Sequence, residues 1–253
     1  MIRALVIGNS HAAALIKGWQ MMVQEYSGKV ELQSFATWEP IYRKLGFQGM
    51  VFGAHAATDL PHHSLDRLTD MNGTQQIDLS AFDHVLHVGL LVPDADLIGT
   101  AGRFDVDGLP DSGRANRLSQ PAFRAWAHSF AQRPPVRAMM QGPWAQLGSR
   151  LTLLRRPRAK ATLFDAAQIP SATIYGAAQD LIDAALTRSA AKAGVRFLPQ
   201  PAESLTDHGL SDGRFADTAP RLRGDKTYTK PDLYHMNAAY GALCLKAWLD
   251  SMT

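Results

Sequence analysis

The chain has 253 residues, of which 46% are hydrophobic and 19% are charged, a composition typical of a folded globular protein rather than a disordered or fibrous one. No stretch approaches the roughly 20 consecutive apolar residues that a membrane-spanning helix requires, and the N-terminus lacks the pattern of a signal peptide. We therefore expect no membrane span and a cytoplasmic location. The single cysteine, Cys244, excludes an intrachain disulfide and a thiolate metal cluster, and its place on an apolar helix face predicts a buried side chain.

The formal net charge of +3 conceals an uneven distribution along the chain. Residues 112–164, which we call the basic segment, contain no Asp or Glu, whereas the other 200 residues carry all 23 acidic side chains and a net charge of −7. The basic side chains of this segment are Arg114, Arg117, Arg124, Arg133, Arg137, Arg150, Arg155, Arg156, Arg158 and Lys160. Such a segment is either a solvated face or a binding surface for an anionic ligand.

Strands and helices are expected to alternate along the chain. Residues 2–8 form a short apolar run that ends in the turn Gly8-Asn9-Ser10, a pattern that predicts a buried strand followed by a helix. In chain order, the patterns predict strands at 2–8, 29–36, 84–90, 136–141 and 195–198, and helices at 12–23, 121–130, 178–186 and 240–248. Pro134-Pro135 is expected to end the second helix, and Gly194 to stop the third.

This alternation predicts one α/β domain over residues 1–253, with a central parallel sheet between two layers of helices. The segments 60–82, 99–118 and 145–170 are expected to be the loops that carry specificity.

Candidate catalytic residues lie at the two ends of the chain. Ligands of open α/β sheets gather at the carboxyl ends of the strands, and Ser10 follows the first strand, a suitable position for a nucleophile. A serine hydroxyl needs a base to take its proton, and His235 is the leading candidate. Asp232, three residues earlier, is placed to accept the imidazole N–H. The alternative role of both Ser10 and Asp232 is helix capping.

These residues resemble the sequence blocks of the SGNH (GDSL-like) hydrolases. The blocks are Gly8-Asn9-Ser10 after the first strand, Gly53 after an apolar segment, and Asp232-Leu233-Tyr234-His235 before the final helix. The resemblance implies a flavodoxin-like three-layer fold and a Ser10, His235 and Asp232 triad. It also implies that the amides of Ser10 and Gly53 bind the oxyanion, and that the reaction needs no metal or organic cofactor.

Two positions depart from the family pattern. Asn9 stands where the family usually has Asp, which preserves the turn. In the third block, the family expects Gly-x-Asn-Asp, with the Asn as an oxyanion donor, but this chain reads Gly89-Leu90-Leu91-Val92. Because the Leu91 side chain donates no hydrogen bond, another group must substitute or turnover must be low. The side chains that the sequence offers as substitutes are those of His55, His87 and Asn116.

The remaining candidates concern substrate binding. Asn9, His11 and Gly89 adjoin the proposed site, and we expect His11 to bind backbone or substrate rather than to deprotonate Ser10. The run Leu154 to Lys160 reads as a loop whose three arginines, Arg155, Arg156 and Arg158, suit a carboxylate or phosphate. Nucleic acid is disfavoured, because no interleaved aromatic residues or nucleic-acid-binding motif accompany the arginines.

The sequence therefore favours a serine ester hydrolase, with an O-acetylated and anionic carbohydrate as the first substrate class to test. An acyltransferase that uses the same triad is a close alternative. A catalytically weakened binding protein on the same fold is an alternative from another class, motivated by the missing third-block Asn. A nucleotide-binding protein is the weakest reading, because no phosphate-binding glycine motif is present.

Overall fold

The computed structural model describes residues 1–90, 94–164, 169–222 and 234–252, and its centre is a five-stranded sheet in which every strand pair is parallel. The strand order is β10-β9-β6-β1-β2. The strands of this sheet are β1 (Ile2–Gly8), β2 (Val30–Ala36), β6 (His84–Leu90), β9 (Leu151–Arg155) and β10 (Arg196–Leu198). Read from the other edge, this is the flavodoxin-like order 2-1-3-4-5, which confirms the predicted fold class.

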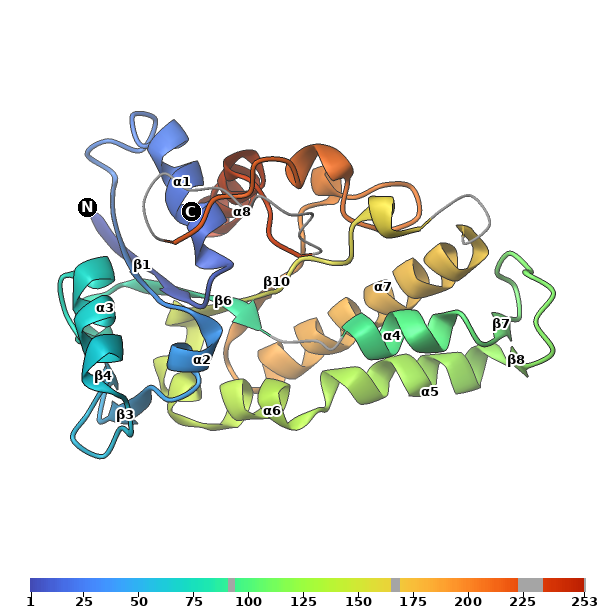
Figure 1. The fold of residues 1–253 in the computed structure, drawn as a ribbon, viewed down its shortest axis with the longest axis horizontal. Helices are drawn as coiled ribbons and strands as arrows, with labels where there is room; N and C mark the ends of the chain where they lie inside the picture. Colours follow the sequence, from blue (N-terminus) through green and yellow to red (C-terminus); the bar gives the residue numbers. More distant parts are fainter. Residues whose placement is uncertain (91–93, 165–168, 223–233, 253) are drawn as a thin grey trace.

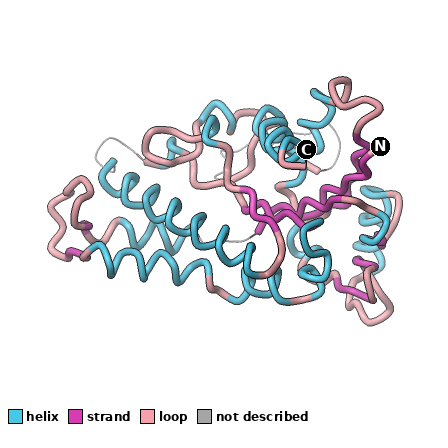
Figure 2. Tube along the Cα trace, turned by 180° about the vertical axis from the view of Figure 1, so that it is seen from behind, coloured by secondary structure: helices cyan, strands magenta, loops and turns pink. Residues whose placement is uncertain are grey.

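Helices cover both faces of the sheet, with α1 and α8 on one face and α4 to α7 on the other (Figures 1 and 2). The helices are α1 (Ala12–Met22), α2 (Glu39–Tyr42), α3 (His62–Asn72), α4 (Asp94–Ala101), α5 (Gln120–Ala131), α6 (Pro134–Gln141), α7 (Ile169–Lys192) and α8 (Ala238–Asp250). Short strands form two further sheets: β3 (Gly46–Gln48), β4 (Val51–Gly53) and β5 (Gln76–Asp78), and β7 (Asp105–Val106) with β8 (Arg117–Leu118).

Alternation along the strands creates two separate hydrophobic cores. In β1, Ala4 and Val6 face α1 and α8, whereas Leu5 and Ile7 face the core shared with α3 to α7. All four side chains are fully buried. A strand that is apolar on both faces is characteristic of a parallel sheet between two helical layers. No helix in the described part of the chain is long and apolar enough to cross a membrane.

Helices α1 and α8 pack unusually closely at two glycines. A Cβ atom on Gly241 would lie 1.9 Å from the Ala14 carbonyl oxygen, and one on Gly18 would lie 2.3 Å from the Ala242 nitrogen. Cys244 on α8 is fully buried, as expected, and burial raises the pKa of its thiol to about 12. Because α1 follows Ser10 and α8 follows His235, this contact brings the two ends of the chain together.

Four predicted segments differ from the structure. Residues 136–141 belong to helix α6 instead of a strand, because Pro134-Pro135 starts this helix after an extended Arg133, and Val136 and Met140 form its buried face. The expected loop 145–170 contains β9, a fully buried strand between β6 and β10. The expected loops 60–82 and 99–118 likewise contain α3 and the β7–β8 pair.

Candidate active site

Ser10 and His235 meet at the carboxyl end of β1. The Nε2 atom of His235 lies 2.8 Å from the Oγ atom of Ser10, although the two residues are 225 positions apart in the chain. This is a hydrogen-bond distance, and it allows the imidazole to take the hydroxyl proton. The site lies where the strand order reverses, between β1 and β6, which is the position at which doubly wound folds bind ligands.

The turn between β1 and α1 holds Ser10 at a helix N-terminus. The amide of Ala12 donates to the Asn9 carbonyl at 3.0 Å, and the amide of Ala13 donates to the Ser10 carbonyl at 3.2 Å. Gly8 allows this turn to approach β6, since a Cβ atom there would lie 2.2 Å from the Val88 carbonyl oxygen. The positive end of the α1 dipole therefore adjoins the Ser10 hydroxyl, where it favours negative charge.

Asn9 and Gly89 brace this turn against β6. The Asn9 side chain is nearly fully buried, and its Oδ1 accepts the His11 amide at 3.2 Å while its Nδ2 lies 3.5 Å from the Gly89 carbonyl oxygen. Gly89 has a positive φ of 92°, and a Cβ atom on it would lie 2.2 Å from Asn9 Oδ1. Both residues were expected to bind substrate, and the contacts that the structure shows for them brace the turn.

His235 is held by the residues that start α8. The Asn237 side chain caps this helix by accepting the Tyr240 amide at 3.2 Å, and it donates to the Arg214 carbonyl. The Asn237 amide also donates to the Phe215 carbonyl at 2.7 Å. The cap fixes the chain just after His235. An Asn directly before an apolar helical pattern is a capping signal, so the sequence carried evidence for this positioning role.

His11 packs against His235 instead of being directed into solvent. The centroids of the two rings are 4.5 Å apart, and their planes differ by 12°. His11 is 8% exposed. His11 was expected to bind backbone or substrate, and in the structure its ring lies against the proposed base.

The family resemblance implies two further residues at this site, Asp232 and Gly53. Asp232 lies outside the described residues. Gly53 lies in the small antiparallel sheet, and Figure 1 shows β4 apart from the start of α1. The next amide, that of Ala54, donates to Gln75 beside β5, so the Gly53 amide faces β3, where Gly46 is its register partner. This orientation argues against Gly53 as an oxyanion donor.

The three arginines expected to bind substrate have different environments. Arg155 and Arg158 are buried, and Asp183 on α7 lies 2.7 Å from a guanidinium nitrogen of each. Arg158 also pairs with Asp180 at 2.7 Å. These ion pairs fasten the end of β9 to α7, which argues against the substrate-binding role expected of Arg155 and Arg158. The Arg156 guanidinium lies 4.1 Å from the centroid of the Tyr234 ring, beside His235 in the sequence.

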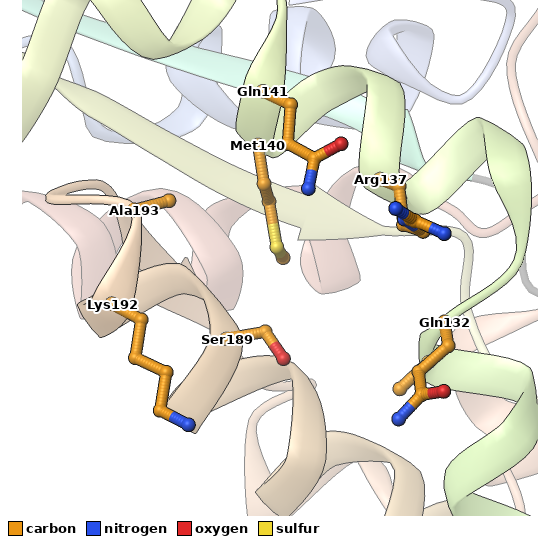
Figure 3. Close-up of a pocket in the computed structure, with 8 residues that line it drawn as sticks. Gln132, Arg137, Met140, Gln141, Ser189, Lys192 and Ala193 are labelled. Atoms are coloured by element: carbon orange, nitrogen blue, oxygen red, sulfur yellow. The ribbon is translucent and has the colours of Figure 1, made fainter.

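Acidic residues outside the basic segment neutralise part of its charge. Arg133 pairs with Asp96 at 2.7 Å, and Arg117 pairs with Asp111 and Asp107. Helices α5, α6 and α7 form a separate pocket of about 450 Å³ (Figure 3). Its lining residues are Ala131, Gln132, Arg137, Met140, Gln141, Ser189, Lys192 and Ala193. Because neither Ser10 nor His235 lines this pocket, it is separate from the candidate active site.

The three side chains that the sequence offers as substitute oxyanion donors either contact other residues or lie far from Ser10. The His55 ring lies within hydrogen-bond distance of the Gly46 carbonyl and of Gln76. His87 is buried between Tyr42 and Trp144, with ring centroids 5.7 and 4.9 Å away, and burial lowers its pKa to about 3. Asn116 belongs to the β7–β8 region at the far end of the helical layer (Figure 1).

The other histidines lie elsewhere in the fold. His62 and His63 are exposed at the start of α3, and the His208 ring is 3.2 Å from Thr173 on α7. In the described part of the chain, no group of three or more His, Cys, Asp or Glu side chains is arranged to hold a metal ion.

Comparison with known proteins supports the architecture. No protein-family model and no curated protein matches the chain. Among solved structures, the chain is similar to the crystal structure of an extracellular lipase from Streptomyces rimosus, with 16% sequence identity, a TM-score of 0.50 and coverage of 100% of both chains. At this identity the similarity concerns the fold. The chain thus has an α/β fold of the kind found in this hydrolase.

Proposed function

We propose that this protein is a serine ester hydrolase of the SGNH type. The observation that carries the proposal is the 2.8 Å contact between His235 Nε2 and Ser10 Oγ at the carboxyl edge of the sheet. A serine hydroxyl and an imidazole at this distance form the nucleophile and base pair of acyl-transfer enzymes. The similarity to the lipase fold adds support, because that fold is compatible with the same chemistry.

The proposed reaction has two steps. Ser10 Oγ attacks the ester carbonyl carbon, and its proton passes to His235 Nε2 as the Oγ–C bond forms. His235 returns that proton to the departing alcohol, which leaves an acyl group on Ser10. Water then attacks the acyl-enzyme with His235 as base, and the carboxylic acid leaves as Ser10 recovers its proton. We assign to Asp232 the role of accepting the Nδ1–H of His235.

The developing oxyanion is stabilised by the Ser10 amide and the positive end of the α1 dipole. The Asn donor that the family carries is replaced here by Leu91. Loss of one oxyanion donor typically lowers turnover by about 10²–10³. We therefore expect slow ester hydrolysis rather than the high turnover of a fully equipped enzyme.

The proposed substrate is an anionic ester, with an O-acetylated acidic carbohydrate as the first candidate. Arg156 is the member of the arginine trio that adjoins the site, through its contact with Tyr234. A guanidinium there favours a carboxylate on the substrate. The Arg156→Gln variant should raise the KM for an anionic aryl ester about tenfold and leave the KM for neutral p-nitrophenyl acetate unchanged. Arg137→Gln, in the separate pocket, is the matched control.

Hydrolysis of p-nitrophenyl acetate by the wild type, Ser10→Ala and His235→Ala proteins tests the proposal. Each variant should lose at least about 10³-fold in kcat, because the two residues act as a unit. A wild-type protein without activity would refute the hydrolase and favour a binding protein on this fold. Activity that appears only when a sugar acceptor is present would identify an acyltransferase.

A further inference from the structure

The two histidine rings of the site are stacked face to face. The ring planes of His11 and His235 differ by 12°, and their centroids are 4.5 Å apart, within the range of stacked aromatic pairs. His11 directly follows Ser10, whereas His235 directly precedes Met236 and the cap of α8. The stack therefore joins the same two segments as the contact between Ser10 and His235.

The His11 ring is carried on a braced part of the backbone. Its amide donates to Asn9 Oδ1 at 3.2 Å, and the Asn9 side chain is itself packed against Gly89 of β6. His11 is 8% exposed, so its ring lies within the packed structure. A side chain fixed in this way forms a rigid surface against which a second ring can be oriented.

The hydrogen bond and the stack constrain the His235 ring in different directions. The contact of Nε2 with Ser10 Oγ acts at one edge of the ring and in its plane. The His11 ring covers one face and opposes tilting of that plane. Together they hold the Nε2 lone pair toward the Ser10 hydroxyl, the geometry that proton transfer requires.

We propose that His11 is a positioning residue that orients His235 and stabilises its protonated form. This inference rests on the proposed hydrolase function. When the Ser10 proton moves to Nε2, His235 becomes an imidazolium whose positive charge lies over the face of the His11 ring. A cation over an aromatic face is stabilised, and this gain is larger after proton transfer than before it. The stack therefore favours the transition state over the bound substrate and acts on kcat rather than on KM.

Two substitutions at His11 distinguish the effect of a flat aromatic ring from the effect of side-chain volume. His11→Leu fills a similar space without a π face, and should lower kcat for p-nitrophenyl acetate by roughly two- to tenfold with KM unchanged. His11→Phe keeps a flat ring and should retain kcat to within about twofold of the wild type. His63→Leu, on the exposed start of α3, is the control that should change neither constant.

A nuclear magnetic resonance measurement reports the stack independently of activity. In histidine-labelled protein, the Hε1 resonance of His235, identified by its loss in His235→Ala, should move in His11→Leu because the neighbouring ring current is removed. It should not move in His63→Leu. Thermal unfolding of each variant shows whether the protein remains folded.

The outcomes distinguish this inference from the proposed function. Full kcat in His11→Leu, or equal losses in His11→Leu and His11→Phe, would overturn the positioning role while leaving the hydrolase intact. An unchanged His235 resonance in His11→Leu would also overturn it, even if the wild-type protein proved inactive. A moved resonance with the expected order of kcat values, wild type and Phe above Leu, would support it.

Discussion

His87 is a buried histidine whose contribution to the free energy of unfolding depends on pH. Its side chain on β6 is 4% exposed, and neither ring nitrogen has a hydrogen-bond partner among the described residues. Burial lowers the pKa of His87 from 6.5 to about 3. Between about pH 3 and pH 6.5, His87 therefore binds a proton in the unfolded chain but not in the folded protein. The free energy of unfolding should consequently fall as the pH falls through this window, from about 6.5 toward 3.

The size of the effect follows from the linkage of protonation to folding. One such group changes the free energy of unfolding by up to about 1.4 kcal/mol per pH unit, which gives about 2 kcal/mol between pH 7 and pH 5. In His87→Leu this contribution is absent, while the other titrating groups remain. At pH 7 the variant should be as stable as the wild type or more so, because an apolar side chain replaces two unpaired buried nitrogens.

Urea unfolding at pH 5, 6 and 7 measures this difference, and Trp144, whose ring contacts His87, provides a fluorescence signal. The wild type should lose about 2 kcal/mol more than His87→Leu between pH 7 and pH 5. His63→Leu removes an exposed histidine and should keep the wild-type pH dependence. Parallel pH profiles for the wild type and His87→Leu would show that His87 is not held neutral.

Three further predictions concern the framework of the site. Asp183→Asn should lower the free energy of unfolding by about 3 kcal/mol, because it weakens the pairing of two buried guanidinium groups. Asp180→Asn changes a carboxylate that is 69% exposed and should cost less than about 1 kcal/mol. Chemical denaturation compares the two variants. Gly89→Ala should displace the Asn9 side chain and lower kcat about tenfold or more, and unchanged kinetics would refute this bracing role. Gly241→Ala should separate α1 from α8 and destabilise the protein by about 3 kcal/mol, as a thermal melt would show.

The sequence predicted the centre of the fold well because three strands have strong local signals. Residues 2–8, 29–36 and 84–90 are apolar runs bounded by turns, and they correspond to β1, β2 and β6. The strand β9 was missed because its apolar run ends in arginines that resemble a loop. Its burial depends on Asp183, which pairs with Arg155 from a distant helix and gives no local signal.

The candidate site was predictable only in part. Ser10 and His235 were identified from two short motifs, and the fold determines that they meet. The stack of His11 on His235 depends on the packing of α1 against α8, which no local pattern reports. The sequence could not place Gly53, because a glycine after an apolar run does not reveal which sheet the strand joins.

Covalent labelling of Ser10 is the most direct test of the proposed nucleophile and base pair. The wild-type protein is incubated with a fluorophosphonate, and the modified peptide is identified by mass spectrometry. We expect one adduct on Ser10, none in Ser10→Ala, and labelling slowed by at least about 10³-fold in His235→Ala. An unlabelled wild-type protein, or an adduct that persists in Ser10→Ala, would contradict the assignment of Ser10 as the nucleophile.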